Sequence, residues 1–300
     1  MNPTIEQLLA FGAVQNVPLS ELTSFRIGGP AALVWQVDSA ERLCSLLSLT
    51  RAHRIPTVLL GKGTNVLAPD AGFDGLVIRF DRPTHPAEYA GNLVRVSAGM
   101  SLTQLAKETV SRGWMGMECL SGIPGTVGGA CAMNAGAYGA EMKQLLRRVR
   151  ILEDGELKWV DVLPDDLGYR KSAFAFPRRI VVEAELALLP DDGGAVQRMQ
   201  SCTQKRREKQ PIELPSAGSV FKRPEGHFAG ALIEQCGLKG RRIGGAQVSE
   251  KHAGFIVNTG GATEADVAAL VREIQNTVLR QTGVRLECEI KRMGEEACIF

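Results

Sequence analysis

The sequence lacks any Cys-x-x-Cys pair, although seven cysteines are spread over its 300 residues. A disulfide framework uses an even number of cysteines, and a structural zinc site uses closely spaced Cys or His ligands, so neither is indicated. The four histidines (His53, His85, His227 and His252) do not lie at metal-binding spacing either. We therefore expect no metal site, and we expect the thiols to be reduced, as they are in the cytoplasm.

A surplus of charge of one sign and a long apolar run are also absent. The 35 basic and 33 acidic residues give a formal net charge of +2, which argues against a general nucleic-acid-binding or membrane-binding surface. No window reaches about 18 consecutive apolar residues, and the N-terminal MNPTIEQLLAFGAV lacks the basic start of a signal peptide. We expect a cytoplasmic protein that binds neither nucleic acid nor membrane. Its oligomeric state is left open.

The patterns along the chain predict a mixed α and β protein of about two domains, with a boundary near residue 195. Asp154-Gly155 lies between two alternating segments and predicts a type I′ hairpin. Short apolar runs bounded by glycine predict strands at 57–61, 75–80, 92–99 and 179–189. Amphipathic segments predict helices at 101–113, 195–210 and 263–283.

The last third of the chain gives the clearest local signals. Thr263 is a suitable N-cap for the third of these helices, and Gly283 follows its end. The alternation in VRLECEIKRMG predicts a strand over 284–294, with Glu287 and Glu289 on the same face.

Three glycine-rich segments indicate a bulky ligand held by backbone amides: GKGTNVL (61–67), SGIPGTVGGA (121–130) and NAGAYG (134–139). Successive N–H groups at a strand end form a concave anion site, and such a site suits a diphosphate. The first segment is not the dinucleotide fingerprint, because Val66 replaces the third glycine and no amphipathic helix follows. The chain also has no G-x-x-x-x-G-K-[ST] segment, which disfavours a nucleotide-hydrolysing P-loop.

These segments resemble the flavin-binding segments of UDP-N-acetylenolpyruvoylglucosamine reductases, in the wider family of vanillyl-alcohol-oxidase-like (PCMH-type) FAD domains. The resemblance runs in order over essentially the whole chain, and the stretch between Arg170 and Ser219 is short, as in the compact subtype. The other matching segments are SFRIGGP (24–30), Tyr169-Arg170, GSVFKRP (218–224), IGGAQV (243–248) and LECEI (286–290). The implied fold is α+β: a PCMH-type FAD-binding domain in two parts, residues 1–75 and 76–195, and a C-terminal α/β substrate domain, residues 196–300.

The resemblance also implies a reaction and the residues that perform it. Such an enzyme uses FAD and NADPH to reduce UDP-N-acetylglucosamine enolpyruvate to UDP-N-acetylmuramate in peptidoglycan synthesis, with hydride from reduced FAD. Ser219 maps onto the proton donor, Arg170 suits the developing negative charge, and Glu289 maps onto a carboxyl that polarises or orients the intermediate. Substrate contacts are expected from Tyr169, Lys222 and Lys239.

The expected cofactor contacts come from the glycine-rich segments and from one arginine before them. They are Arg26, Gly61, Lys62, Gly63, Thr64, Asn65, Val66, Leu67, Ser121, Gly122, Ile123, Pro124, Gly125, Thr126, Gly128, Gly129, Asn134, Ala135, Gly136 and Tyr138.

Each of these assignments has a simpler structural alternative. Taken alone, Ser219 reads as a turn hydroxyl, Arg170 as a surface or ion-pairing residue, and Glu289 as an exposed strand residue. KRREK (205–209) reads as a solvated basic helix face, although nucleotide phosphates would also attract it, and His252 reads as a packing or surface histidine. Only the combination of the segments, in order, favours the functional reading.

Other functions remain open at this point. Ser219-Val220-Phe221-Lys222 fits the S-x-x-K motif of serine acylases, but Ser-Asp-Asn and Lys-Thr-Gly are both missing and the local residues disfavour a helix. A flavoprotein oxidase on the same fold is a second alternative, although no histidine lies in the glycine-rich segments for covalent flavin attachment. A nucleotide-binding module without catalysis is the third. The chain departs from the usual family pattern at Ser24, Arg223 and Cys288.

Overall fold

The computed structural model of the chain describes residues 3–294. Its first part is a four-stranded sheet in the order β1-β2-β5-β3, in which β1 is antiparallel to β2 while β5 runs parallel to both of its neighbours. The elements are α1 (Pro3–Ala10), β1 (Val14–Pro18), α2 (Leu19–Leu22), β2 (Pro30–Gln36), α3 (Ala40–Ala52), β3 (Thr57–Leu60), β4 (Val66–Leu67) and β5 (Phe73–Arg79). β5 crosses residue 75, where the sequence placed the first internal boundary.

The second part is a five-stranded antiparallel sheet in the order β12-β11-β15-β7-β6. Its strands are β6 (Glu88–Ala90), β7 (Leu93–Ser97), β11 (Leu146–Glu153), β12 (Glu156–Asp161) and β15 (Ile180–Ala187). The helices are α4 (Leu102–Ser111), η1 (Glu118–Leu120), α5 (Val127–Met133), η2 (Met142–Gln144), η3 (Pro164–Asp166) and α6 (Ala195–Lys209). Two-residue strands complete it: β8 (Trp114–Met115), β9 (Gly136–Ala137), β10 (Ala140–Glu141), β13 (Leu167–Gly168), β14 (Lys171–Ser172) and β16 (Leu189–Pro190).

The hairpin between β11 and β12 confirms the turn predicted at Asp154-Gly155. Glu153 pairs with Glu156 across a two-residue loop, and both loop residues have positive φ, 52° at Asp154 and 87° at Gly155. A type I′ turn requires this left-handed conformation at both positions, because only then does the turn match the twist of the strands. The two strands are thereby fixed in one register at the edge of the sheet.

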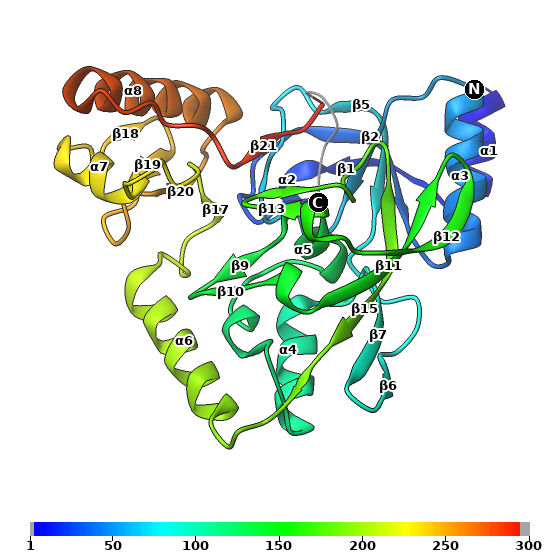
Figure 1. The fold of residues 1–300 in the computed structure, drawn as a ribbon. Helices are drawn as coiled ribbons and strands as arrows, with labels where there is room; N and C mark the ends of the chain where they lie inside the picture. Colours follow the sequence, from blue (N-terminus) through cyan, green and yellow to red (C-terminus); the bar gives the residue numbers. More distant parts are fainter. Residues whose placement is uncertain (1–2, 295–300) are drawn as a thin grey trace.

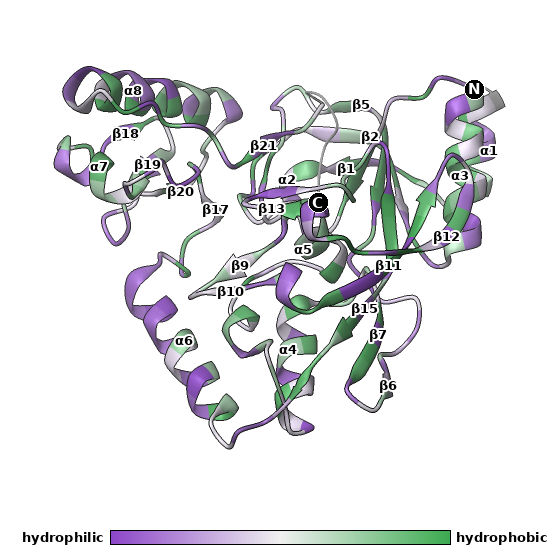
Figure 2. Ribbon diagram, in the orientation of Figure 1, coloured by the Kyte–Doolittle hydropathy of each residue, from purple (hydrophilic) through white to green (hydrophobic). Residues whose placement is uncertain are grey.

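The C-terminal part is a small antiparallel sheet in the order β17-β20-β19-β18, with two helices (Figure 1). Its elements are β17 (Ser216–Ser219), α7 (Ala229–Gln235), β18 (Arg242–Ile243), β19 (Ala246–Val248), β20 (Phe255–Asn258), α8 (Glu264–Thr282) and β21 (Lys291–Arg292). α8 confirms the predicted third helix: the Thr263 hydroxyl accepts the Asp266 N–H, and Gly283 ends the helix with φ of 74°. Figure 2 shows hydrophobic and hydrophilic stretches alternating along its ribbon. Its buried side chains form one apolar stripe: Val267, Leu270, Val271, Ile274 and Val278.

The strand expected over 284–294 forms only in part. Phe221 and Cys288 make an isolated antiparallel bridge, flanked by the bonds from Lys222 N–H to Glu287 O (2.8 Å) and from Glu289 N–H to Val220 O (2.8 Å). Only Lys291–Arg292 counts as a strand, paired in parallel with β4. The expected alternation is only partly present, because Leu286 and Ile290 are buried and Glu287 is exposed, but the Glu289 side chain is only 12% exposed. The segment pairs with a partner for a few residues at a time and does not join a continuous sheet.

Several polar contacts hold the C-terminal part against the first sheet. The Ser24 hydroxyl donates to Ser216 O at 2.6 Å, and Asn258 Nδ2 donates to Phe25 O at 3.1 Å. The Asp70 carboxylate accepts the N–H groups of Glu264 (2.8 Å) and Ala265 (3.2 Å) at the start of α8. The hydrophobic core of the C-terminal part includes Phe25, Ile27 and Leu67, so apolar packing continues across the boundary. No helix within residues 3–294 is both long and apolar enough to cross a membrane.

Candidate active site

A cavity of about 270 Å³ lies where the glycine-rich segments meet the C-terminal part. One wall is formed by Thr64, Asn65 and the stretch from Ile123 to Thr126, and a second by Gly129, Ala135 and Gly136. Arg170, Ser219 and Glu289 line the same cavity. The fold therefore brings together two sets of residues that are far apart in the sequence.

Each of the three candidate catalytic residues is placed by a different segment. Arg170 lies in the turn between β13 and β14, and Ser219 ends β17 directly after Gly218, whose φ is 78°. Glu289 follows the bridge between Phe221 and Cys288, so it is tied to the strand that carries Ser219. The Ser219 hydroxyl donates to Phe221 O at 3.2 Å.

An ion pair crosses from one part of the molecule to the other within this cavity. Arg170 Nε lies 2.8 Å from Glu289 Oε1, and the two side chains are 23% and 12% exposed. Burial raises the pKa of the Glu289 carboxyl above its ordinary value, and the positive charge of Arg170 opposes that shift.

Backbone strain is concentrated at residues that the sequence had marked as site residues. Arg26, Asn134, Tyr138 and Arg170 all have positive φ, between 42° and 55°. This conformation is unfavourable for residues with a Cβ, and it persists where the surrounding structure enforces it, as at ligand sites. At Asn134 the enforcing contacts are visible, because its side chain donates to Glu141 and to Gly168 O.

The glycine-rich segments pack against one another closely enough to require glycine. A Cβ on Gly61 would lie 2.7 Å from Thr126 Oγ1, which itself accepts the Gly129 N–H at the start of α5. Lys62 donates to Ser101 Oγ at 2.9 Å, and Ser101 in turn forms an isolated antiparallel bridge with Thr126 of the second glycine-rich segment. The loops are thus locked together, with their backbone facing the cavity.

The remaining predicted cofactor residues lie in three kinds of place. Arg26 and Gly122 line a second cavity next to the first, together with Thr64 and Pro124. Tyr138 is exposed. The other six predicted cofactor residues are buried: Gly63, Val66, Leu67, Ser121, Gly128 and Asn134.

Of the three predicted substrate residues, one lines a cavity and two are held in ion pairs. Tyr169 lines a third cavity, which also contains Arg170, Ser219 and Glu289. The Lys222 ammonium contacts the Glu287 carboxylate, and Lys239 lies 2.9 Å from Glu234.

Sequence reasoning missed Arg206 and undervalued His252. Arg206 lines both the first and the second cavity, and burial lowers the pKa of its guanidinium, so the KRREK segment is not simply a solvated face. A signal was available: Arg206 lies four residues after the buried Cys202 on α6, which is largely hydrophilic toward its C-terminal end, and hence on the same face of the helix. Figure 2 shows the mixed hydropathy of this helix. His252 lines the first and third cavities, and burial lowers its pKa. No group of three or more metal-binding side chains occurs in the described part of the chain.

Comparison with known proteins agrees with this geometry. Residues 30–161 match the family described as "FAD binding domain", and residues 210–293 match "UDP-N-acetylenolpyruvoylglucosamine reductase, C-terminal domain". The UDP-N-acetylenolpyruvoylglucosamine reductase of Alkaliphilus oremlandii is 43% identical over 93% of this chain and 92% of its own length. That of Agathobacter rectalis is 43% identical over 97% of this chain and 96% of its own.

A solved structure gives the same result. The crystal structure of UDP-N-acetylenolpyruvylglucosamine reductase from Thermus caldophilus superposes with a TM-score of 0.78 at 36% identity, covering 93% of this chain and 98% of that one. Sequence and structure agree over nearly the whole length of both chains. The protein therefore belongs to the UDP-N-acetylenolpyruvoylglucosamine reductase family.

Proposed function

We propose that this chain reduces the enolpyruvyl ether of UDP-N-acetylglucosamine with Arg170, Ser219 and Glu289 as its catalytic residues. The family membership makes it an FAD-dependent oxidoreductase of peptidoglycan synthesis that uses NADPH. The roles of individual residues are our proposal. The observation that carries it is the meeting of these three side chains in one cavity walled by the glycine-rich segments.

The residues around the first two cavities fit FAD. The walls offer backbone and small side chains at Gly125, Gly129 and Gly136, against which a flat ring system packs. Lys62 and Arg206 supply positive charge, and Arg206 is a largely buried cation for which a diphosphate is a suitable partner. When bound there, FAD supplies the hydride chemistry that protein side chains cannot perform.

Arg170 is suited to hold the carboxylate of the enolpyruvyl group. Its permanent charge is suited to stabilise the negative charge that develops next to that carboxylate, and its guanidinium has further N–H donors besides the Nε–H that faces Glu289. The ion pair with Glu289 keeps the guanidinium in place before the substrate arrives.

Ser219 is suited to deliver one proton from a fixed direction. Its hydroxyl proton is committed only to a long bond of 3.2 Å with a backbone oxygen, so it can turn toward the substrate carbon. Glu289 lies beside Arg170, and because burial raises the pKa of its carboxyl it takes up a proton more readily than an exposed glutamate, which suits a group that orients the intermediate or relays a proton to Ser219.

The geometry does not support the serine acylase alternative. Ser219 ends a strand and Lys222 lies beyond it in extended chain, with its ammonium on Glu287, so the lysine is not one helical turn from the serine. For the oxidase alternative, no histidine lies in the glycine-rich segments as a site of covalent attachment. Reduction of an enol ether therefore remains the function that the site supports best.

We further propose that the working units divide near residues 81 and 210. β5 completes the first sheet at Arg79. α6 packs against η1 and α4 of the second part, and the match to the C-terminal family domain begins at residue 210.

Stopped-flow absorbance of the bound flavin tests the proposal in two steps. NADPH should bleach the flavin, and the enolpyruvyl sugar nucleotide should restore its colour. In Ser219→Ala the first step should be nearly unchanged, while the second slows by about 10²-fold or more, the usual weight of a general acid. Ser45→Ala is the control, since Ser45 is exposed on α3 and lines none of the three cavities, and it should slow neither step. Equal slowing of both steps in Ser219→Ala would refute the proton-donor role.

A further inference from the structure

An exposed aromatic surface lies at the edge of the third cavity and has no part in the chemistry above. Phe228 is 62% exposed. The guanidinium carbon of Arg223 lies 4.0 Å from the centre of its ring, so one face of the ring rests on a cation. With one face covered and most of the side chain open, Phe228 presents a flat apolar face to solvent.

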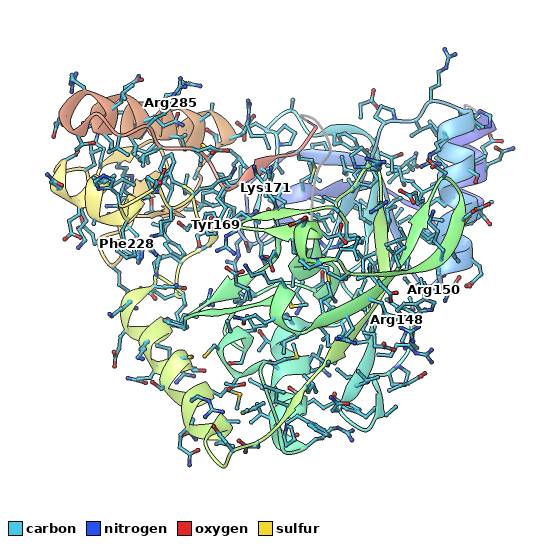
Figure 3. The ribbon with its side chains drawn as sticks, in the orientation of Figure 1. Arg148, Arg150, Tyr169, Lys171, Phe228 and Arg285 are labelled. Carbon is cyan, nitrogen blue, oxygen red and sulfur yellow. The ribbon has the colours of Figure 1, made fainter. Side chains whose placement is uncertain are left out.

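The Arg223 side chain is held in position under this ring. Its backbone N–H donates to the Tyr169 hydroxyl at 3.0 Å, and its Nε–H donates to His227 O at 3.3 Å. Tyr169 comes from the β13–β14 turn and Phe228 from the segment before α7, so the two aromatic residues approach this cavity from different parts of the molecule (Figure 3). Arg223 therefore links the aromatic surface to the side of the cavity that carries Arg170.

This surface and the catalytic residues share one cavity. Phe228, Arg223 and Tyr169 line it together with Ser219 and Glu289. Its lining contains four cationic residues, Arg170, Lys209, Arg223 and Lys251, against two carboxylates, Glu234 and Glu289. One cavity therefore combines Ser219, a surplus of cationic side chains and the exposed ring of Phe228, which suits a ligand with a reacting end, an anionic group and a flat apolar ring.

We propose that Phe228, supported by Arg223, is the platform on which the uracil ring of the substrate stacks. This inference rests on the proposed function, because it takes the enolpyruvyl end to lie at Ser219. The sugar nucleotide has the required order of groups: the enolpyruvyl ether, the sugar, an anionic diphosphate and then a planar base. An aromatic side chain holds a nucleobase by stacking on its flat face.

Binding of UDP provides the test, measured by calorimetry on the FAD-loaded enzyme and by competition against the enolpyruvyl substrate. Phe228→Leu keeps an apolar side chain and removes the stacking face, so it should raise the dissociation constant of UDP and the KM of the substrate by about 5- to 100-fold. Phe228→Tyr should restore most of the affinity. Inhibition by inorganic diphosphate and the rate of flavin reduction by NADPH should not change. Leu163→Ala is the control, since Leu163 is equally exposed at 62% but does not line this cavity.

Three results would overturn the inference. They are unchanged UDP binding in Phe228→Leu, an equal loss of affinity for inorganic diphosphate, and a loss confined to NADPH. Failure of the proposed function looks different: UDP binds in a Phe228-dependent manner, but the enolpyruvyl substrate does not reoxidise the flavin. Normal reoxidation with Phe228-independent UDP binding would leave the function intact and remove the platform.

Discussion

Asp70 joins two parts of the chain by capping a helix that belongs to the other part. Its two carboxylate oxygens accept the N–H groups of Glu264 and Ala265, the first two residues of α8. The next N–H, of Asp266, is already satisfied by Thr263 within the C-terminal part. Removing Asp70 therefore leaves the helix with its own cap and takes away only the bonds that cross the boundary.

The expected cost of Asp70→Ala is about 1 kcal/mol of unfolding free energy, the usual value of an N-cap acceptor at an exposed helix start. A loss of about 1 kcal/mol of unfolding free energy lowers the melting temperature by about 2–4 °C in chains of similar or somewhat smaller size. Asp70→Asn keeps one acceptor oxygen and loses the charge, so it should cost about half as much. The assay is urea unfolding of the FAD-saturated protein, followed by far-ultraviolet circular dichroism at low salt and at about 1 M salt, where the charge term is screened.

The control is Asp74→Ala, which removes an exposed carboxylate from β5 and should change stability by less than about 0.5 kcal/mol. If Asp70→Ala were as stable as the unmodified protein, the bonds to α8 would not hold the two parts together. If Asp70→Asn were as damaging as Asp70→Ala, the effect would not come from the number of accepted bonds.

Two further predictions concern the ion pair in the cavity. Arg170→Ala should slow reoxidation of the reduced flavin by the equivalent of about 3 kcal/mol, the scale of a lost oxyanion contact, and an unchanged rate of this step would remove Arg170 from the mechanism. Because burial raises the pKa of Glu289 above its ordinary 4.5, the folded protein binds this proton more tightly than the unfolded chain does. The unmodified protein should therefore lose unfolding free energy as the pH rises from about 4.5 to the raised pKa of Glu289. Glu289→Gln has no such proton to lose, so its unfolding free energy, measured with urea, should increase relative to that of the unmodified protein over the same pH range. A pH-independent difference between the two proteins would show that Glu289 titrates normally.

Local signals in the sequence were enough to predict the hairpin at Asp154-Gly155 and the helix from Thr263 to Gly283. In both cases the residues that set the backbone angles or satisfy the first N–H groups are neighbours in the chain. The parallel pairing of β21 with β4 was not predictable in this way, because its partners are separated by most of the sequence. The same holds for the short ladder at 286–290, whose partner segment lies around Phe221.

Some residues of the candidate site could be predicted from the sequence and others could not. The resemblance to a known family indicated Arg170, Ser219 and Glu289, whereas no local pattern distinguished Ser219 from an ordinary turn serine. Arg206 was missed because its charge suggested solvent, and only its position four residues after Cys202 indicated a buried face. Burial of a charged side chain depends on what packs over the helix, and that information is not local.

The short ladder between the Ser219 segment and the Glu289 segment holds two side chains of the cavity in a fixed relation. Both residues belong to the C-terminal part and are tied to each other through Val220 and Phe221. Arg170 belongs to the flavin-binding part, and its ion pair with Glu289 bridges the two parts. A substitution or a ligand that shifted one part relative to the other would therefore displace Arg170 from Ser219 and Glu289 together.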